Sequence, residues 1–325
     1  FLFTNLLILS GTLILFRSSR GEETCDTTEF NKQFEKIRNA SGFIAALDQS
    51  GGSTPKALSA YGYPQERYVE GQESMYEAVH EMRTRIMTSP SFHGDYILAA
   101  ILFENTMNRS VQDKPTTPEY LWQNKGIVPI LKVDKGLEDE QDGVQLMKPI
   151  PGLDSLLQRA KSLGVFGTKM RSVIHDANPS GIQQVVTQQF AIAKQIMAAG
   201  LVPIVEPEVS ITSDEKARAE ILLKQLLLEH LNQLSPHEYV ILKLSLPSVD
   251  NFYKELIHHP NVLRVVALSG GYPREEANSI LARQNDMIAS FSRALVENLE
   301  YSMSSEDFDR KLHESITSIY TASKT

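Results

Sequence analysis

A lysine stands inside an apolar, β-rich run of this chain. The run covers residues 239–247, and Lys243 lies in it between Leu242 and Leu244. A short run of this kind is typical of a buried strand. Burial disfavours the charged form of an amine, and an uncharged amine is a nucleophile that can form a Schiff base with a carbonyl substrate. A lysine at a strand end can instead extend into water, so Lys243 alone leaves both interpretations open.

Charged and polar residues also occur where other apolar runs end. Any one of them is equally well explained as the start of a solvated loop. Together they are harder to dismiss, because buried charges need partners, and acids and lysines around one cavity supply both partners and acid–base chemistry. The residues in question are Asp48, Lys132, Asp134, Lys169, Arg171, Glu206, Glu208, Lys243, Ser269, Gly270, Gly271 and Arg293.

Eight apolar runs alternate with amphipathic helical patterns along the chain. A β-then-α alternation requires a parallel sheet with helical crossovers, and closing such a sheet gives a barrel. The competing fold is an open doubly wound sheet, but neither G-x-G-x-x-G nor G-x-x-x-x-G-K-[ST] follows a predicted strand. We therefore predict an α/β fold, a single-domain (β/α)8 TIM barrel. The predicted strands cover residues 43–47, 96–103, 127–133, 165–170, 202–205, 239–244, 262–268 and 287–291.

Helix start and stop signals support this alternation. One helix is predicted from Asn178-Pro179 to Gly200, a second from Thr212 to about Leu234, and a third from Pro273. A final helix is predicted over residues 304–323, opened by a capping box of Ser304 and Asp307. In a barrel the carboxyl ends of the strands meet at one face, where active sites are built, and the loops after strands seven and eight commonly bind phosphate.

Composition excludes several classes of function. The 325 residues carry a net charge of −8 and no Lys/Arg-rich run, which argues against a nucleic-acid partner. The one cysteine, Cys25, excludes an internal disulfide and a cysteine-based zinc cluster. The eight histidines, including the adjacent His258 and His259 at a predicted helix end, show no metal-ligand spacing. The sequence therefore predicts no metal site.

The first sixteen residues are almost wholly apolar. They are short for a membrane span and lack the basic start and small-residue cleavage site of a signal peptide. A truncated targeting segment and non-native upstream sequence both stay open. We therefore set residues 1–26 apart and assign residues 27–325 to the folded domain, for which we expect no membrane association and a cytoplasmic location, with organellar targeting left open.

Five segments resemble class I fructose-1,6-bisphosphate aldolase, in its shorter, bacterial-type branch. The likeness covers about residues 28–323 and is most specific in the fourth segment and in the Lys-Val-Asp-Lys-Gly part of the second. The segments are FIAALDQS at 43–50, GIVPILKVDKG at 126–136, TKMR at 168–171, GLVPIVEPEV at 200–209 and ALSGG at 267–271.

The resemblance implies a metal-independent, cofactor-free cleavage of fructose 1,6-bisphosphate. Lys243 would form the Schiff base, Glu206 would shuttle protons, and Glu208 would orient the lysine network. Asp48 would take the proton from the hydroxyl beside the scissile bond, and Lys169 would lie near Lys243 as a second cation. The phosphate of the aldehyde half would be bound by Lys132 and Arg171. The phosphate of the ketone half would be bound by Ser269, Gly270, Gly271 and Arg293, with Ser50 and Ser53 as further polar contacts.

The chain departs from the family pattern in places. Gln49 replaces an acid that often follows Asp48, Leu244 replaces a proline after Lys243, and the long C-terminal extension ending in tyrosine is absent, so the final proton donor is unassigned. We expect Tyr320 to pack rather than to donate a proton. Another Schiff-base sugar-phosphate aldolase or transaldolase, or a non-catalytic barrel scaffold, are the alternatives, and a homo-oligomer is one open assembly.

Overall fold

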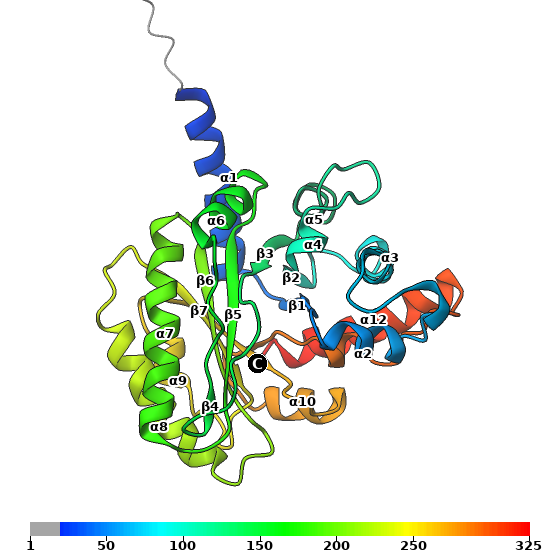
Figure 1. Ribbon diagram of the computed structural model, residues 1–325. Helices are drawn as coiled ribbons and strands as arrows, with labels where there is room; N and C mark the ends of the chain where they lie inside the picture. Colours follow the sequence, from blue (N-terminus) through cyan, green and yellow to red (C-terminus); the bar gives the residue numbers. More distant parts are fainter. Residues whose placement is uncertain (1–19) are drawn as a thin grey trace, which may run out of the picture.

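The computed structural model describes residues 20–325, and eight parallel strands in it form a barrel (Figure 1). Ala46 N donates a hydrogen bond to Phe291 O at 3.1 Å, which joins the first strand to the segment after the last. The predicted fold is therefore confirmed. The barrel strands, in spatial order, are β1 (Phe43–Leu47), β2 (Ile97–Leu102), β3 (Val128–Lys132), β5 (Gly167–Ile174), β6 (Val202–Val209), β7 (Val240–Ser245), β8 (Val262–Leu268) and β9 (Ile288–Ala289).

The barrel interior is filled by apolar side chains that alternate along each strand. Ile44 and Ala46 on β1, and Val202 and Ile204 on β6, belong to one buried cluster. A second cluster contains outward-facing strand residues together with helix residues such as Leu223. Because side chains on a strand repeat with a period of two, the inward series on four of the strands continues, two residues further on, into a polar residue. Ala46 leads to Asp48, Ile130 to Lys132, Ile204 to Glu206, and Ile241 to Lys243.

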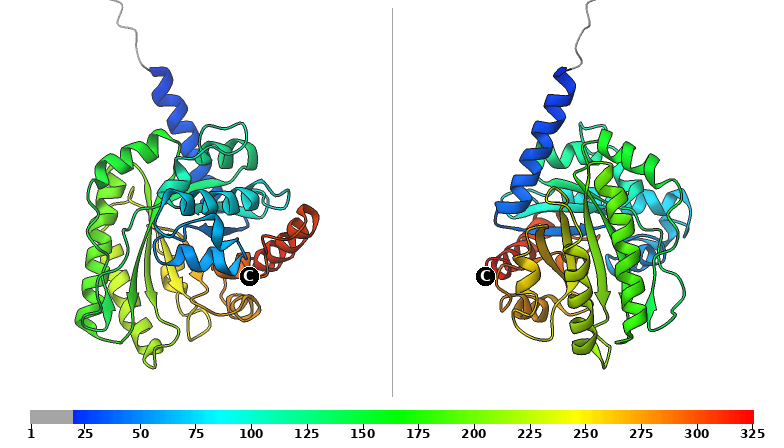
Figure 2. Two further views of the ribbon diagram at one scale, coloured as in Figure 1. Left: turned by 45° about the vertical axis from the view of Figure 1, so that its right-hand side comes forward. Right: turned by 90° about the vertical axis from the view of Figure 1, so that its left-hand side faces the viewer.

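Helices surround the barrel, with α7 and α12 on opposite sides of it (Figure 2). The amino-terminal part of α1 projects away from the barrel, and its later residues pack against the amino ends of the strands, where Phe30 stacks on Phe166 with centroids 5.1 Å apart. The helices are α1 (Arg20–Asn39), α2 (Ser53–Ala60), α3 (Glu73–Thr88), α4 (Glu104–Met107), α5 (Thr117–Lys125), α6 (Leu153–Ser162), α7 (Pro179–Ala198), α8 (Lys216–Leu231), α9 (Lys254–Ile257), α10 (Arg274–Leu281), α11 (Arg293–Val296) and α12 (Ser305–Ala322).

The predicted helices are present with small shifts of their ends. The capping box of α12 is confirmed, because Asp307 N donates to Ser304 Oγ at 3.1 Å. The helix expected from Thr212 begins later, at Lys216, because residues 210–215 form turns held by side chains such as Ser213, whose Oγ accepts from Glu215 N at 3.2 Å. His258 directly follows α9 as expected.

Two features lie outside the sequence prediction. The two-residue strand β4 (Val144–Gln145) pairs antiparallel with the end of β5, in a loop that we left unassigned. The predicted boundary between residues 26 and 27 falls within α1, while residues 1–19 of the apolar segment lie outside the described part of the chain. Among the described residues, no helix combines the length and apolar character needed to cross a membrane.

Candidate active site

Four buried charged side chains from four strands meet at the carboxyl ends of the barrel. Lys169 Nζ on β5 lies 2.8 Å from Asp48 Oδ2 and 2.8 Å from Glu206 Oε2. Glu206 Oε1 lies 3.2 Å from Lys243 Nζ on β7. Each of the four residues is at most 8% exposed. The two lysines and two carboxylates therefore form a continuous chain of opposite charges, as sequence analysis predicted for one cavity.

The protonation of this cluster is set by mutual attraction. Burial opposes ionisation of Asp48, but the charges of Lys169, Lys243 and Lys132 and the hydrogen bond from Lys169 hold the pKa of that carboxyl below its usual range. Burial likewise opposes the charge of Lys169, but Asp48 and Glu206 raise its pKa above its ordinary value. Asp48 is consequently a carboxylate and Lys169 an ammonium group at neutral pH.

A second charged group lies next to the first along β3, β5 and β6. Lys132 and Lys169 are register partners across β3 and β5, and Lys132 Nζ lies 2.7 Å from Asp134 Oδ1. Arg171 Nε donates to Glu208 Oε2 at 2.6 Å. Burial works against the charge of Arg171, but the neighbouring Glu208 raises its pKa. Lys132 and Arg171 thus form a cationic pair at one side of the buried cluster.

The loops after β8 and β9 form a third group. Ser269 is buried, while Gly270 and Gly271 have φ angles of 63° and 116°, in the region that favours glycine. A Cβ built on Gly271 would lie 3.5 Å from Nη2 of Arg293, which opens α11. Exposed backbone N–H groups beside a guanidinium are suited to a phosphate.

The two predicted serines of the loop after β1 contact each other. Ser53 Oγ donates to the main-chain O of Ser50 at 2.8 Å and accepts from Ser50 N at 3.0 Å. These bonds shape the turn that opens α2. The described hydrogen bonds do not join either serine to the buried cluster.

Two residues to which sequence analysis assigned no role support the site. Asp134 accepts from Lys132 and also from Arg171 N at 3.3 Å, so it supports both cations. Gln189 on α7 accepts from Glu206 N at 3.0 Å and donates to Ser172 Oγ at 3.0 Å. Asp134 was already among the polar residues at the strand ends, but without a role, whereas Gln189 was missed. Gln189 had as its signal only a polar residue on the apolar face of a helix.

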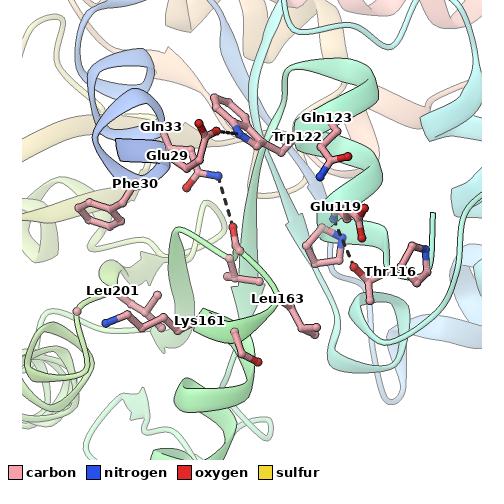
Figure 3. A pocket seen from close by; sticks show the side chains of 16 residues that line it. Glu29, Phe30, Gln33, Thr116, Glu119, Trp122, Gln123, Lys161, Leu163 and Leu201 are labelled. Carbon is pink, nitrogen blue, oxygen red and sulfur yellow. Dashed lines mark hydrogen bonds between the residues drawn. The ribbon is translucent and has the colours of Figure 1, made fainter. Parts of the chain in front are cut away.

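A cleft elsewhere on the surface carries none of the predicted residues. It lies between α1, α5 and the turn after α6, with Phe30, Trp122 and Leu163 in its lining (Figure 3). Trp122 Nε1 donates to Glu29 Oε2 at 2.7 Å across one wall. Val165 and Leu201 in its lining precede β5 and β6, so the cleft is at the amino ends of the strands, opposite the charged cluster. In the described part of the chain, no three His, Cys, Asp or Glu side chains gather in a way that could hold a metal ion.

The chain matches one family model and a known protein of the same family. Residues 30–247 match the family model described as fructose-bisphosphate aldolase class-I. The chain is 62% identical over 294 residues to the Synechocystis protein named fructose-bisphosphate aldolase class 1, covering 90% of this chain and 97% of that one.

Two solved structures share the fold. Fructose-bisphosphate aldolase from Plasmodium falciparum, solved with TRAP and a small-molecule inhibitor, superposes with a TM-score of 0.70 at 21% identity, over 92% of this chain and 95% of that one. The Corynebacterium glutamicum protein Cgl0159 gives a TM-score of 0.52 at 12% identity, over 93% and 94%. At these identities the likeness concerns the barrel alone.

Proposed function

This chain belongs to the class I fructose-bisphosphate aldolase family, and we propose that Lys243 is the amine with which it attacks its substrate. The enzyme is a lyase that reversibly cleaves fructose 1,6-bisphosphate to dihydroxyacetone phosphate and glyceraldehyde 3-phosphate. The observation that carries the assignment to Lys243 is its burial beside a carboxylate oxygen, at 4% exposure and 3.2 Å from Glu206 Oε1.

In this proposal Glu206 moves the protons that Schiff-base formation requires. The amine adds to the ketone carbon, and the resulting carbinolamine must gain a proton on its oxygen before water can leave. Glu206 Oε1 is within hydrogen-bond reach of Lys243 Nζ, which is the geometric requirement for a general acid or base. The iminium that results draws electrons from the adjacent carbon–carbon bond, so that cleavage leaves an enamine rather than a bare carbanion.

Asp48 then takes the proton of the hydroxyl beside the bond that breaks. A base must be ionised before it can accept a proton, and the lowered pKa of Asp48 keeps it so. Lys169 forms an ion pair with each of the two carboxylates, Asp48 and Glu206, and so fixes the distance between these two proton-transfer groups. Glu208, bound to Arg171, orients the outer part of the same network.

Two cationic groups hold the two phosphates. We assign the aldehyde-half phosphate to Lys132 and Arg171, and the ketone-half phosphate to Ser269, Gly270, Gly271 and Arg293, with Ser50 and Ser53 as further contacts. Held at both ends, the substrate presents its ketone carbon to Lys243, which supplies the proximity contribution to catalysis. The negative charge of the whole chain does not prevent this, because the lysines and arginines of the site set the local potential.

Reductive trapping tests the assignment of the nucleophile. The purified enzyme is treated with borohydride in the presence of dihydroxyacetone phosphate, and its peptides are analysed by mass spectrometry. A reduced adduct is expected on Lys243 and not on Lys169, the other buried lysine of the cluster. An adduct on Lys169, or none at all, would overturn the proposal.

Residues 27–325 form the catalytic domain in this proposal, and the enzyme works in the cytoplasm. All proposed site residues lie between Asp48 and Arg293. A chain without residues 1–26 is therefore expected to retain its kcat, and loss of activity in a chain that still folds would count against this boundary. Assembly as a homo-oligomer stays a prediction, which light scattering of the purified enzyme tests.

A further inference from the structure

A buried arginine that has no assigned role lies against the loop that follows β1. Arg83 on α3 is 1% exposed. Its Nη1 donates to Thr106 Oγ1 at 2.7 Å, and its Nη2 donates to the main-chain O of Gln49. Its Nε has no hydrogen-bond partner within the described chain, and no carboxylate there forms an ion pair with it. A buried cation bound only to neutral acceptors is costly, so its retention needs an explanation.

Asp48 supplies part of that explanation. Burial lowers the pKa of Arg83 to about 10, and the negative charge of Asp48 acts against this lowering. The guanidinium of Arg83 and the carboxylate of Asp48, the proposed base, therefore attract each other electrostatically. The guanidinium also donates to the carbonyl O of Gln49, the residue after Asp48, and this bond fixes the Gln49–Ser50 peptide.

The side chain of Gln49 extends this support toward the phosphate loop. Its Nε2 donates to Ser292 Oγ, and Ser292 directly precedes Arg293. Arg293 is exposed and opens a helix of four residues, so little else in its own element fixes it. One path of hydrogen bonds thus runs from the interior of α3, through the loop after β1, to the residue before the phosphate-binding arginine.

We infer that Arg83 and Gln49 are positioning residues, which fix Asp48 and Arg293 relative to each other. The inference rests on the roles proposed above for those two residues. Asp48 lies in the loop after β1, and Arg293 opens the four-residue helix α11 after the last strand; such connecting segments have more backbone freedom than the strands. A displacement of about 1 Å at a reacting group can cost roughly a hundredfold in rate, so a rigid connection between base and phosphate site has a direct effect on turnover.

The two halves of the connection predict different kinetic defects. Arg83→Met removes the donor behind Asp48, and we expect kcat to fall by about 10- to 100-fold with a rise in KM. Gln49→Leu keeps the main-chain acceptor but loses the bond to Ser292. For this variant we expect KM to rise by about tenfold while kcat changes by less than about threefold. Ser292→Ala should reproduce the Gln49→Leu effect, because it removes the same bond from the other side.

Arg264→Met is the matched control. Arg264 is also largely buried and donates to main-chain carbonyls, those of Ile37 and Ala40 at 2.7 and 2.6 Å, but at the amino ends of the strands. Its replacement should lower the melting temperature and leave kcat and KM within about twofold. If Arg83→Met behaves in the same way, Arg83 is merely structural and the inference is wrong.

Two further measurements keep the result decisive. If Arg83→Met does not fold, the loop variants Gln49→Leu and Ser292→Ala decide, and unchanged KM in both overturns the inference. Borohydride trapping of dihydroxyacetone phosphate on each folded variant separates this inference from the proposed function. An adduct on Lys243 in an Arg83→Met enzyme with a lowered kcat supports a positioning role for Arg83. If the unmodified enzyme forms no adduct, the proposed role of Lys243 is wrong, and the kinetic comparison with Arg264→Met alone decides the role of Arg83.

Discussion

Lys169 lies between two buried carboxylates, and this position gives it a role that no other cation of the cluster shares. It forms ion pairs with Asp48 and Glu206 at 2.8 Å each, while among the described carboxylates Lys243 forms an ion pair only with Glu206. Without the Lys169 ammonium group, two negative charges would share a buried space with one amine. Such an arrangement forces a carboxyl to take up a proton.

Lys169→Met should therefore damage both activity and stability. The pKa of Asp48 should rise toward or above its ordinary value, so that part of this proposed base is protonated and the acid limb of the kcat profile moves to higher pH. We expect kcat to fall by about 10²- to 10⁴-fold, as for loss of general acid–base function. The free energy of unfolding should fall by about 3–5 kcal/mol because a buried pair is broken. A folded Lys169→Met enzyme with an unshifted acid limb would contradict this account.

Replacement of Arg171 should affect fructose 1,6-bisphosphate and fructose 1-phosphate differently. Arg171→Gln keeps a polar side chain but removes the charge assigned to the aldehyde-half phosphate. The KM for fructose 1,6-bisphosphate should rise by about 10- to 100-fold, the worth of one or two charge-assisted hydrogen bonds. Fructose 1-phosphate lacks that phosphate, so its kcat/KM should change little. An equal loss for both substrates would remove Arg171 from the aldehyde-half phosphate site.

At the scale of the elements, the pairing of β5 with β6 aligns the site. Arg171 lies opposite Glu206 in register, and Lys169 lies opposite Ile204. Periodicity predicted which residues of each strand share a face but not this register. Apolar runs identified the strands, and the period of two placed Lys169 with Arg171 and Glu206 with Glu208. The partners of these residues were beyond prediction. Whether Glu208 meets Arg171 or another cation depends on the stagger between strands, which sequence patterns do not give.

The contributions of helices to the site were harder still to predict. Gln189 lies on α7 and Arg83 on α3, far in sequence from the strand ends that they support. Arg83 falls between Met82 and Ile86 on a buried helical face, where an arginine is usually interpreted as extending to the surface. β4 was missed because its two residues are too short for a periodic signal, and its pairing with β5 depends on the tertiary structure.

Gly167 tests how much the alignment of β5 depends on close backbone approach. A Cβ at this position would lie 2.2 Å from the main-chain O of Val202, so Gly167→Ala must separate the start of β5 from β6. We expect a loss of about 1–3 kcal/mol, as for overpacking in a core, together with a reduced kcat. Gly52→Ala is the control, because a Cβ there meets nothing within 4 Å and its φ is −64°. Equal urea midpoints for the two variants would show that β5 has room to move.

At the scale of the whole molecule, the barrel interior has two layers: an apolar lower layer between the strands and a charged upper layer at their carboxyl ends. The lower layer contains residues such as Ile44, Val128 and Ile241, all fully buried. The upper layer places Asp48, Lys169, Glu206 and Lys243 directly above it at no more than 8% exposure. The apolar layer gives folding its driving force, and the charged layer imposes a desolvation cost that ion pairing must offset. The stability of the barrel should therefore depend on pH through the charged layer.

The pH dependence has a sign that the pKa shifts determine. Asp48 has a lowered pKa in the folded chain, so its contribution to stability is complete above its unfolded pKa of about 3.9 and is lost as the pH falls below that value. Lys169 has a raised pKa, so its contribution is complete below about 10.4 and is lost as the pH rises. Asp48→Asn should accordingly lower the free energy of unfolding most at neutral pH. In urea titrations at pH 7, 5 and 3.5, the difference between the unmodified enzyme and Asp48→Asn should shrink toward the lowest pH. A difference that stays constant across this range would mean that the charge of Asp48 contributes nothing to the stability of the barrel.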